Sequence, residues 1–476
     1  KNIKEECSKL FKDFDLNLVN FIGIPNSAIQ NNISMSLYNI GKYFAENNKI
    51  DLGIYFLGIA ITMPESSEET FNDLSYLYGH IGNNTKSLEI LNKGIEKYPE
   101  SFIINYNLGS FFTKMILLNI KEYDIQKCKI EGIKYLIKAI EINPTSIESY
   151  VNVGSIYNHF NEKEEAIGYL EKAYQLNPKD FNTCFNLGTI YGEIKNDYNK
   201  AIQYLKEAVE IDPKSSEANT NLGISYDYNK DFDNASKYFK IAIDNSDFND
   251  TNPYFNYANL LAHNNMFEEA IKEYKNCLKI KNDNSPTLFN IALTYIYKNE
   301  IENAIFYFIK FIEQDKNNNR AYYLLSWCYN YLEKEEEAIR YAEISLDLNK
   351  NDILSLILLS NLYNKKNPRK TIKLLEKILE ITPEHEQIWK IYNNIAVSNI
   401  SIKDFQKAKK YLLLAEKIKQ DSNEIKLNLA ICDNDKEKIE LYRNIQGHEE
   451  IIPQIDEIKK LNPIDSSLQK LKAAWT

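Results

Sequence analysis

The chain has 476 residues, of which 44% are hydrophobic and 26% are charged, so it can bury a core and is not a disordered tail. The formal net charge is −10 and the charges are interspersed, which argues against nucleic acid as a partner because phosphate binding needs a basic face. The longest apolar stretch, Ile353 to Leu359, is too short to span a bilayer, so no membrane partner is expected.

Residues 1–33 precede the first clear repeat. We expect them to form an N-terminal helical cap or to be the remnant of an upstream repeat. The chain begins with Lys1 rather than Met, so we expect that an upstream segment has been removed, and a removed targeting segment stays open.

From residue 34 to residue 422 one pattern recurs, and residues 147–180 show it most clearly. A first amphipathic stripe occupies positions i, i+3, i+4 and i+7, at Tyr150, Val153, Gly154 and Tyr157. The polar break "NEKEE" follows, and a second stripe runs through Ala166, Leu170 and Ala173. Pro178 ends this second stripe because proline cannot continue a helix. Each unit is therefore predicted to be a helical hairpin.

Small residues return at fixed places in successive units. In the first predicted helix they are Gly41, Ser75, Gly109, Gly154, Gly188, Gly223, Ala258, Ala292, Ser326, Ser360, Ala396 and Ala430. At the start of the second they include Gly132, Ala166, Ala201, Ala235, Ala270, Ala304 and Ala338. Glycine is costly inside a helix, so its return at one phase predicts a close approach of two backbones. Pro99, Pro144, Pro178, Pro213 and Pro383 mark the ends of hairpins.

This order of small residue, tyrosine, small residue and proline, at a period of 34 or 35 residues, resembles the tetratricopeptide repeat. The resemblance covers residues 34–422 in eleven hairpins, with a degenerate twelfth and C-terminal capping helices in residues 423–476. It implies an all-α fold, an α-solenoid that winds as a right-handed superhelix of eleven to twelve repeats. The unit 102–146 carries extra residues between Lys114 and Cys128, which we regard as a candidate surface for self-association.

An asparagine stands two residues before many of the recurring small residues. The members of this row include Asn107, Asn152, Asn186, Asn221, Asn256 and Asn290. Two residues along an α-helix correspond to a rotation of about 200°, so the asparagine faces away from the helix that the glycine contacts. We expect a ladder of amides that bonds the backbone of an extended peptide in the concave groove. Such a ladder resembles the one in the superhelical repeat half of O-linked N-acetylglucosamine transferases. The alternative is that each amide bonds a neighbouring helix.

Aromatic residues on the same face or its flank predict pockets for peptide side chains. These residues are Phe255, Phe289, Tyr297, Tyr323, Trp327 and Tyr331. Trp327 lies three residues after Leu324, which replaces the asparagine of its unit. The alternative is that the rings pack between hairpins.

No arrangement of nucleophile and base, paired carboxylates or glycine-rich phosphate loop is apparent, so we expect no enzyme activity and no cofactor. His80, His159 and His263 share one phase but lie two or three units apart, so they cannot share a metal and are expected to be exposed. The six cysteines form no CxxC pair, which favours buried, reduced thiols in a cytoplasmic, intracellular protein.

The sequence thus predicts a non-catalytic scaffold that binds an extended segment of a protein partner. An alternative is the substrate-recruiting repeat region of a larger enzyme, for example a glycosyltransferase, whose catalytic domain lies outside this chain. Helical-repeat RNA binding is disfavoured by the acidic charge. Recognition of a C-terminal carboxylate, as in the chaperone-binding members of the family, is rejected because Val151, Phe185 and Phe289 precede the asparagines where lysine is needed.

Overall fold

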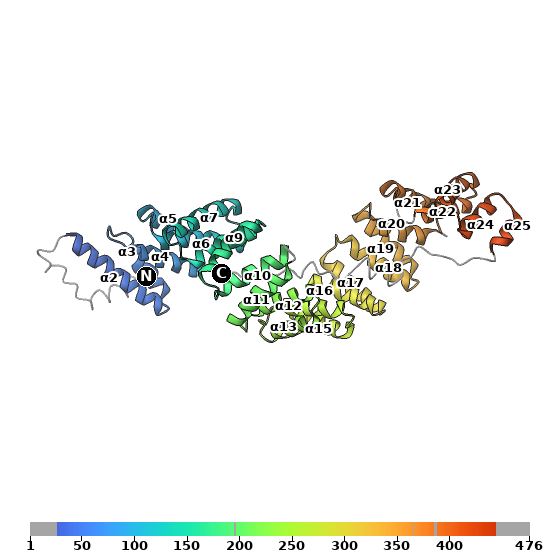
Figure 1. Ribbon diagram of the computed structural model, residues 1–476. Coiled ribbons are helices and arrows are strands. Elements are labelled where there is room, and N and C mark those ends of the chain that lie inside the picture. Colours follow the sequence, from blue (N-terminus) through green and yellow to red (C-terminus); the bar gives the residue numbers. More distant parts are fainter. Residues whose placement is uncertain (1–25, 195–196, 365, 385–387, 444–476) are drawn as a thin grey trace. The chain divides into compact units, whose positions relative to one another are not determined.

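The computed structural model describes residues 26–194, 197–364, 366–384 and 388–443 (Figure 1). Over these ranges the chain forms 24 α-helices, α2 to α25, and no strand, which confirms the predicted all-α solenoid of helical hairpins. The expected caps in residues 1–25 and 444–476, and Cys7, lie outside the described residues. None of the helices in the described ranges is long and apolar enough to cross a lipid bilayer.

The chain divides after Asp231 into two compact units. In unit 1 the first helices of the hairpins are α2 (Asn26–Glu46), α4 (Glu68–His80), α6 (Phe102–Leu117), α8 (Ile147–His159), α10 (Phe181–Ile194) and α12 (Ser216–Tyr228). The second helices of unit 1 are α3 (Ile50–Ala60), α5 (Asn84–Lys97), α7 (Ile125–Ile142), α9 (Lys163–Leu176) and α11 (Tyr198–Ile211).

Unit 2 continues the same alternation. Its first helices are α14 (Asn252–His263), α16 (Ser285–Tyr297), α18 (Asn319–Tyr331), α20 (Ile353–Tyr363), α22 (Ile388–Ser401) and α24 (Asn423–Cys432). Its second helices are α13 (Phe232–Asp244), α15 (Phe267–Ile280), α17 (Ile301–Gln314), α19 (Glu335–Leu348), α21 (Pro368–Ile381), α23 (Phe405–Ile418) and α25 (Lys436–Arg443).

Local sequence sets the ends of these helices. Ser101, Ser146 and Ser215 cap first helices by accepting a hydrogen bond from the backbone N–H three residues further on. Turns after several first helices contain a residue with positive φ, for example Asn161 at 61° and Asn299 at 63°. As predicted, a proline stands two residues after the last residue of five second helices, at Pro99, Pro144, Pro178, Pro213 and Pro383.

The recurring small residues lie where the helices of one hairpin meet. A Cβ atom on Gly188 would lie 2.6 Å from Leu205 Cγ and 3.1 Å from the Ala201 backbone oxygen, both in α11. Ala201 and Ala166 are fully buried. First helices also contact each other, as α6 does with α8 and α14 with α16. The predicted close approach of backbones is therefore confirmed, and each of these four first helices packs against its own second helix and against another first helix.

The extra residues of the unit 102–146 lengthen both of its helices. α6 has 16 residues and α7 has 18, against 13 in α8 and 14 in α9. Leu118, just after α6, is 52% exposed, and Ile130 in α7 is 65% exposed. The insertion thus adds helix length and two exposed aliphatic side chains.

Candidate functional site

The amide row predicted as an open ladder is buried over most of its length. The exposed fraction is 4% for Asn152, 2% for Asn186, 1% for Asn221, 3% for Asn256 and 1% for Asn290. Asn107 is half-buried. The expectation that these side chains face an open groove is therefore corrected for five of the six, because a neighbouring first helix covers the side opposite the second helix. Contact of the row with a peptide stays a prediction.

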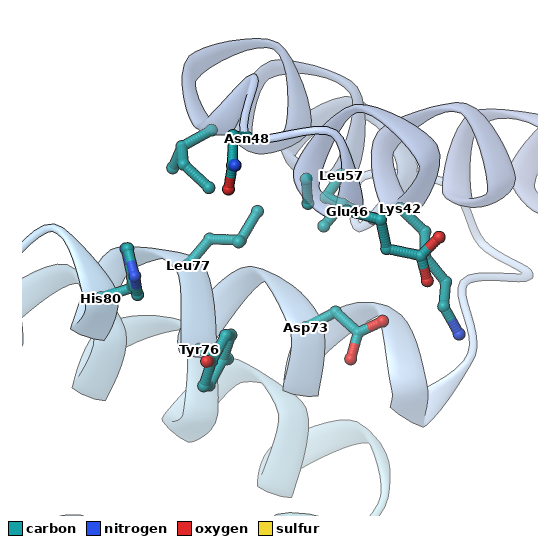
Figure 2. A pocket seen from close by; sticks show the side chains of 10 residues that line it. Lys42, Glu46, Asn48, Leu57, Asp73, Tyr76, Leu77 and His80 are labelled. Carbon is teal, nitrogen blue, oxygen red and sulfur yellow. The ribbon is translucent and has the colours of Figure 1, made fainter.

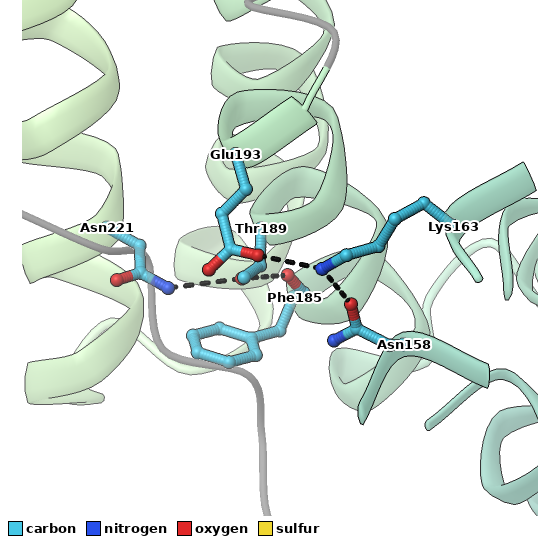
Figure 3. Close-up of polar contacts among 6 residues, drawn as sticks. All are labelled: Asn158, Lys163, Phe185, Thr189, Glu193 and Asn221. Carbon is cyan, nitrogen blue, oxygen red and sulfur yellow. Dashed lines mark hydrogen bonds and ion pairs between the residues drawn. The ribbon is translucent and has the colours of Figure 1, made fainter. Parts of the chain in front are cut away.

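Several of these amides bond a neighbouring first helix. In Figure 3, Asn221 Nδ2 in α12 donates to Thr189 Oγ1 in α10 at 3.1 Å. Asn290 Nδ2 in α16 donates to Asn259 Oδ1 in α14 at 2.9 Å. Asn107 donates to the side-chain oxygen of Asn72 in α4. These bonds match the alternative that the sequence left open, in which the amides hold neighbouring helices together.

Four of the predicted aromatic contact residues belong to the core of unit 2. The exposed fraction is 5% for Phe255, 6% for Phe289, 2% for Tyr323 and 1% for Trp327. Phe289, for example, lies 5.7 Å from Phe308 and 5.2 Å from Phe311 between ring centroids. The expectation of accessible pockets lined by these four rings is corrected, since they fill the space between helices instead.

Tyr297 and Tyr331 remain accessible. Tyr297 is half-buried and Tyr331 is 45% exposed. The Tyr331 ring stacks on Trp327 at a centroid distance of 5.4 Å, and its hydroxyl donates to Asn299 Oδ1 at 3.0 Å. The buried indole therefore supports an exposed ring at the end of α18.

An accessible row does run along the first helices, seven residues after the amide position. In unit 1 it consists of Glu46, His80, Lys114, His159, Glu193 and Tyr228, all exposed, and in unit 2 of His263, Tyr297 and Tyr331. The expected exposure of the three histidines is confirmed. Sequence reasoning identified part of this row and missed Glu46, Lys114, Glu193 and Tyr228. The sequence contains a signal for the exposure of these four residues. In these nine units the position seven residues after the amide carries a charged or aromatic side chain and never an aliphatic one.

In unit 1 a lysine of a second helix contacts a member of this row and an asparagine of its own hairpin. Lys163 Nζ in α9 lies 2.5 Å from Asn158 Oδ1 in α8 and 3.0 Å from Glu193 Oε2 in α10 (Figure 3). The Lys163 side chain is only 12% exposed. Partial burial of the imidazole ring lowers the pKa of His159, next to Asn158.

A pocket opens at the start of the accessible row, between α2, α3 and α4, and we call it the α2–α4 pocket (Figure 2). Its volume is about 280 Å³. It is lined by Lys42, Ala45, Glu46, Asn48, Ile50, Leu57, Asp73, Tyr76, Leu77 and His80. Asp73 occupies the amide position of its unit and accepts from Tyr38 Oη at 3.0 Å and from Asn72 Nδ2 at 3.0 Å. Burial, and then the Asp73 carboxylate, raise the pKa of Tyr38 to about 12.

The cysteines in the part of the chain that the structure describes are free thiols and most of them are buried. Cys128, Cys184, Cys277 and Cys328 are buried free thiols and Cys432 is half-buried, which confirms the predicted burial for four of them. Burial raises the pKa of the Cys328 thiol. Within the described ranges, no three His, Cys, Asp or Glu side chains are placed to share a metal ion.

Comparison with known proteins identifies the repeat. The family model described as "Tetratricopeptide repeat" matches residues 147–180, 181–215, 251–284, 285–318, 320–352 and 390–422. No curated protein sequence gives a significant match.

Among solved structures, a protective antigen of uropathogenic Escherichia coli with an SLR fold matches with a TM-score of 0.51 at 14% identity, over 93% of this chain and 96% of that one. The C-terminal part of a TPR repeat-containing protein from Cytophaga hutchinsonii matches over 52% of this chain and 99% of that one, at 16% identity and a TM-score of 0.46. YrrB, a TPR protein with an unusual peptide-binding site, matches over 39% of this chain and 95% of that one, at 18% identity and a TM-score of 0.34.

The six repeats matched by the family model, the hairpin architecture and the likeness to an SLR-fold structure agree with one another. Repeats of this kind support a protein–protein interaction scaffold. The chain therefore contains six tetratricopeptide repeats within residues 147–422.

Proposed function

We propose that the chain is a non-catalytic scaffold that binds an extended segment of a partner protein along the accessible row of its first helices. The row offers one side chain per hairpin, which suits a segment that places successive side chains against successive repeats. In this proposal the buried amides Asn221 and Asn290 hold neighbouring first helices together. Asn152, Asn186 and Asn256 are also buried, and the half-buried Asn107 is the amide within reach of the segment.

The observation that carries this proposal is the exposure of one phase of the first helices in repeat after repeat. In unit 2 this phase presents Tyr297 and Tyr331, two large rings that can cover a partner's apolar side chains. In unit 1 this phase includes two acidic residues, Glu46 and Glu193, and one lysine, Lys114, which can select a partner by charge.

Selection from a library of random, unstructured peptides on the full chain tests the proposal. We expect the selected peptides to bind a Tyr297→Ala, Tyr331→Ala double variant at least ~10-fold more weakly, since truncating an aromatic contact residue costs about 1–2 kcal/mol. Phe306→Ala is the matched control, because Phe306 is 51% exposed but lies on the second helix α17. Equal binding by the double variant, or the same loss in the control, would contradict the assignment to the first helices.

Self-association through the insertion is a second candidate, favoured by the exposure of Leu118 and Ile130. We expect the chain to form oligomers at high concentration, and Leu118→Ser with Ile130→Ser to return it to the monomer mass in light scattering. Ile81→Ser is the control, since Ile81 is 50% exposed outside the insertion. Oligomers that persist in the double variant would place the interface elsewhere.

The four buried thiols agree with the cytoplasmic location that the sequence predicts.

A further inference from the structure

We infer that the α2–α4 pocket is a subsite for one basic side chain, arginine or lysine, of the segment that the scaffold binds. That the basic side chain belongs to a bound segment rests on the proposed function. The preference of the pocket for a basic side chain does not rest on it. The pocket lies at the first member of the accessible row, Glu46, and also contains the second, His80.

Two carboxylates at the rim provide the charge complementarity. Hydrogen bonds from Tyr38 and Asn72 fix Asp73, and Asn107 donates to the side-chain oxygen of Asn72. This chain of bonds orders the Asp73 carboxylate before any ligand arrives, which lowers the entropic cost of binding. Glu46 is exposed on α2 and is also part of the lining.

The single lysine of the pocket forms no ion pair with these carboxylates. Among the described residues, neither Glu46 nor Asp73 forms an ion pair with a lysine or arginine. The Lys42 ammonium instead lies 5.9 Å from the centre of the Tyr38 ring. A guanidinium or ammonium group entering the pocket therefore meets two carboxylate acceptors that hold no other cation.

The remaining lining suits the rest of a long basic side chain. Leu57 is fully buried and Leu77 is 4% exposed, so they form an apolar floor for the methylene groups. The Tyr76 ring also lines the pocket and is 68% exposed, and the face of an exposed aromatic ring can contact a cation. A volume of about 280 Å³ accommodates one such side chain and excludes a larger folded element.

The probe for this subsite is N-acetyl-arginine methylamide, with N-acetyl-citrulline methylamide as its uncharged isostere, and saturation-transfer NMR on the full chain measures both. We expect the arginine probe to bind about fivefold more tightly than the citrulline probe, because one partly exposed ion pair contributes at most about that factor. A Glu46→Gln, Asp73→Asn double variant should lose this preference, and Tyr76→Leu should weaken binding of the arginine probe.

Glu96→Gln is the matched control, since Glu96 is an exposed carboxylate of unit 1 outside the pocket. Asn at position 73 keeps an acceptor for Tyr38, and circular dichroism confirms that each variant folds. Equal binding of the two probes, or a preference that survives in the double variant, would overturn the subsite.

The two proposals fail separately. If selected peptides bind the scaffold but tolerate citrulline in place of every arginine and an uncharged isostere in place of every lysine, the subsite is wrong and the scaffold function stands. If the arginine probe binds with the expected preference but no peptide is selected, the pocket stands and the binding of an extended segment is wrong.

Discussion

Asn259 Oδ1 in α14 accepts two hydrogen bonds from other helices of unit 2. Asn290 Nδ2 in α16 donates to it at 2.9 Å, and Tyr274 Oη in α15 donates at 2.5 Å. Asn259 and Tyr274 are fully buried and Asn290 is 1% exposed. One oxygen atom thus joins both helices of one hairpin to the first helix of the next, away from water.

Removal of this oxygen should destabilise unit 2. We expect Asn259→Ala to lower the free energy of unfolding by about 2–3 kcal/mol, because it removes an oxygen that accepts from two buried donors. Asn290→Ala should cost less, about 1–2 kcal/mol. Urea unfolding followed by tryptophan fluorescence, to which the buried Trp327 contributes, measures both. Asn303→Ala, at an exposed site of α17, should change stability by less than about 0.5 kcal/mol. If Asn259→Ala is as mild as this control, the bonds contribute little.

Two glycines of neighbouring hairpins should respond oppositely to the same substitution. Gly188→Ala forces a Cβ to within 2.6 Å of Leu205 Cγ, so we expect a loss of about 1–3 kcal/mol from overpacking. Gly168, on the exposed side of α9, has no atom within 4 Å of such a Cβ. Gly168→Ala should therefore stabilise the chain by about 0.5–1 kcal/mol. Thermal unfolding of both variants checks this, and the same sign for both would refute the packing argument.

The sequence predicted the hairpins because their period and small residues are local signals. Gly154, Gly188 and the prolines repeat at fixed phases. Each of the two glycines reports a close contact within its hairpin, and the prolines mark the ends of second helices. Helix ends and the contact of Gly188 with α11 could therefore be read directly.

The exposure of the amide row could not be read in the same way. A rotation of about 200° placed Asn186 opposite the second helix, which is correct, but that side of a first helix is covered by the next first helix. Burial there depends on contacts between repeats, which no single repeat encodes. Packing between first helices also buries Trp327. Tyr331 lies one turn later on the same helix and is exposed.

Turn residues with left-handed backbone give a further prediction. Of the ten positive-φ residues in the described ranges, six are Asn and one is Gly82, with φ of 78°. Lys403 has φ of 66° without the tolerance of Asn or Gly for this conformation. We expect Lys403→Asn to stabilise the chain, and Gly82→Ala to destabilise it by about 1 kcal/mol. A Cβ on Gly82 meets no atom within 4 Å, so its effect on thermal unfolding isolates backbone strain. No loss of stability in Gly82→Ala would contradict the assignment.

Stability at alkaline pH should depend on Cys184. Burial, and then the negative charges of Glu207 and Asp180, raise the pKa of this thiol to about 12, from an ordinary value of 9.0. Glu207 also accepts from Tyr174 Oη at 2.9 Å. A raised pKa means that the folded state favours the neutral thiol. The stabilisation is therefore complete below pH 9 and is lost as the pH rises from 9 toward 12.

The measurement is the free energy of unfolding in urea at pH 8 and at pH 10.5, for the wild type and for Cys184→Ala. Between these two values we expect the wild type to lose about 2 kcal/mol more than the variant, since one pKa unit corresponds to about 1.4 kcal/mol. The variant retains Tyr174, whose pKa is also raised to about 12, so the difference between the two proteins reports the thiol alone. Parallel losses in both would mean that Cys184 ionises in the folded chain as readily as in the unfolded one, which the burial of its side chain does not allow.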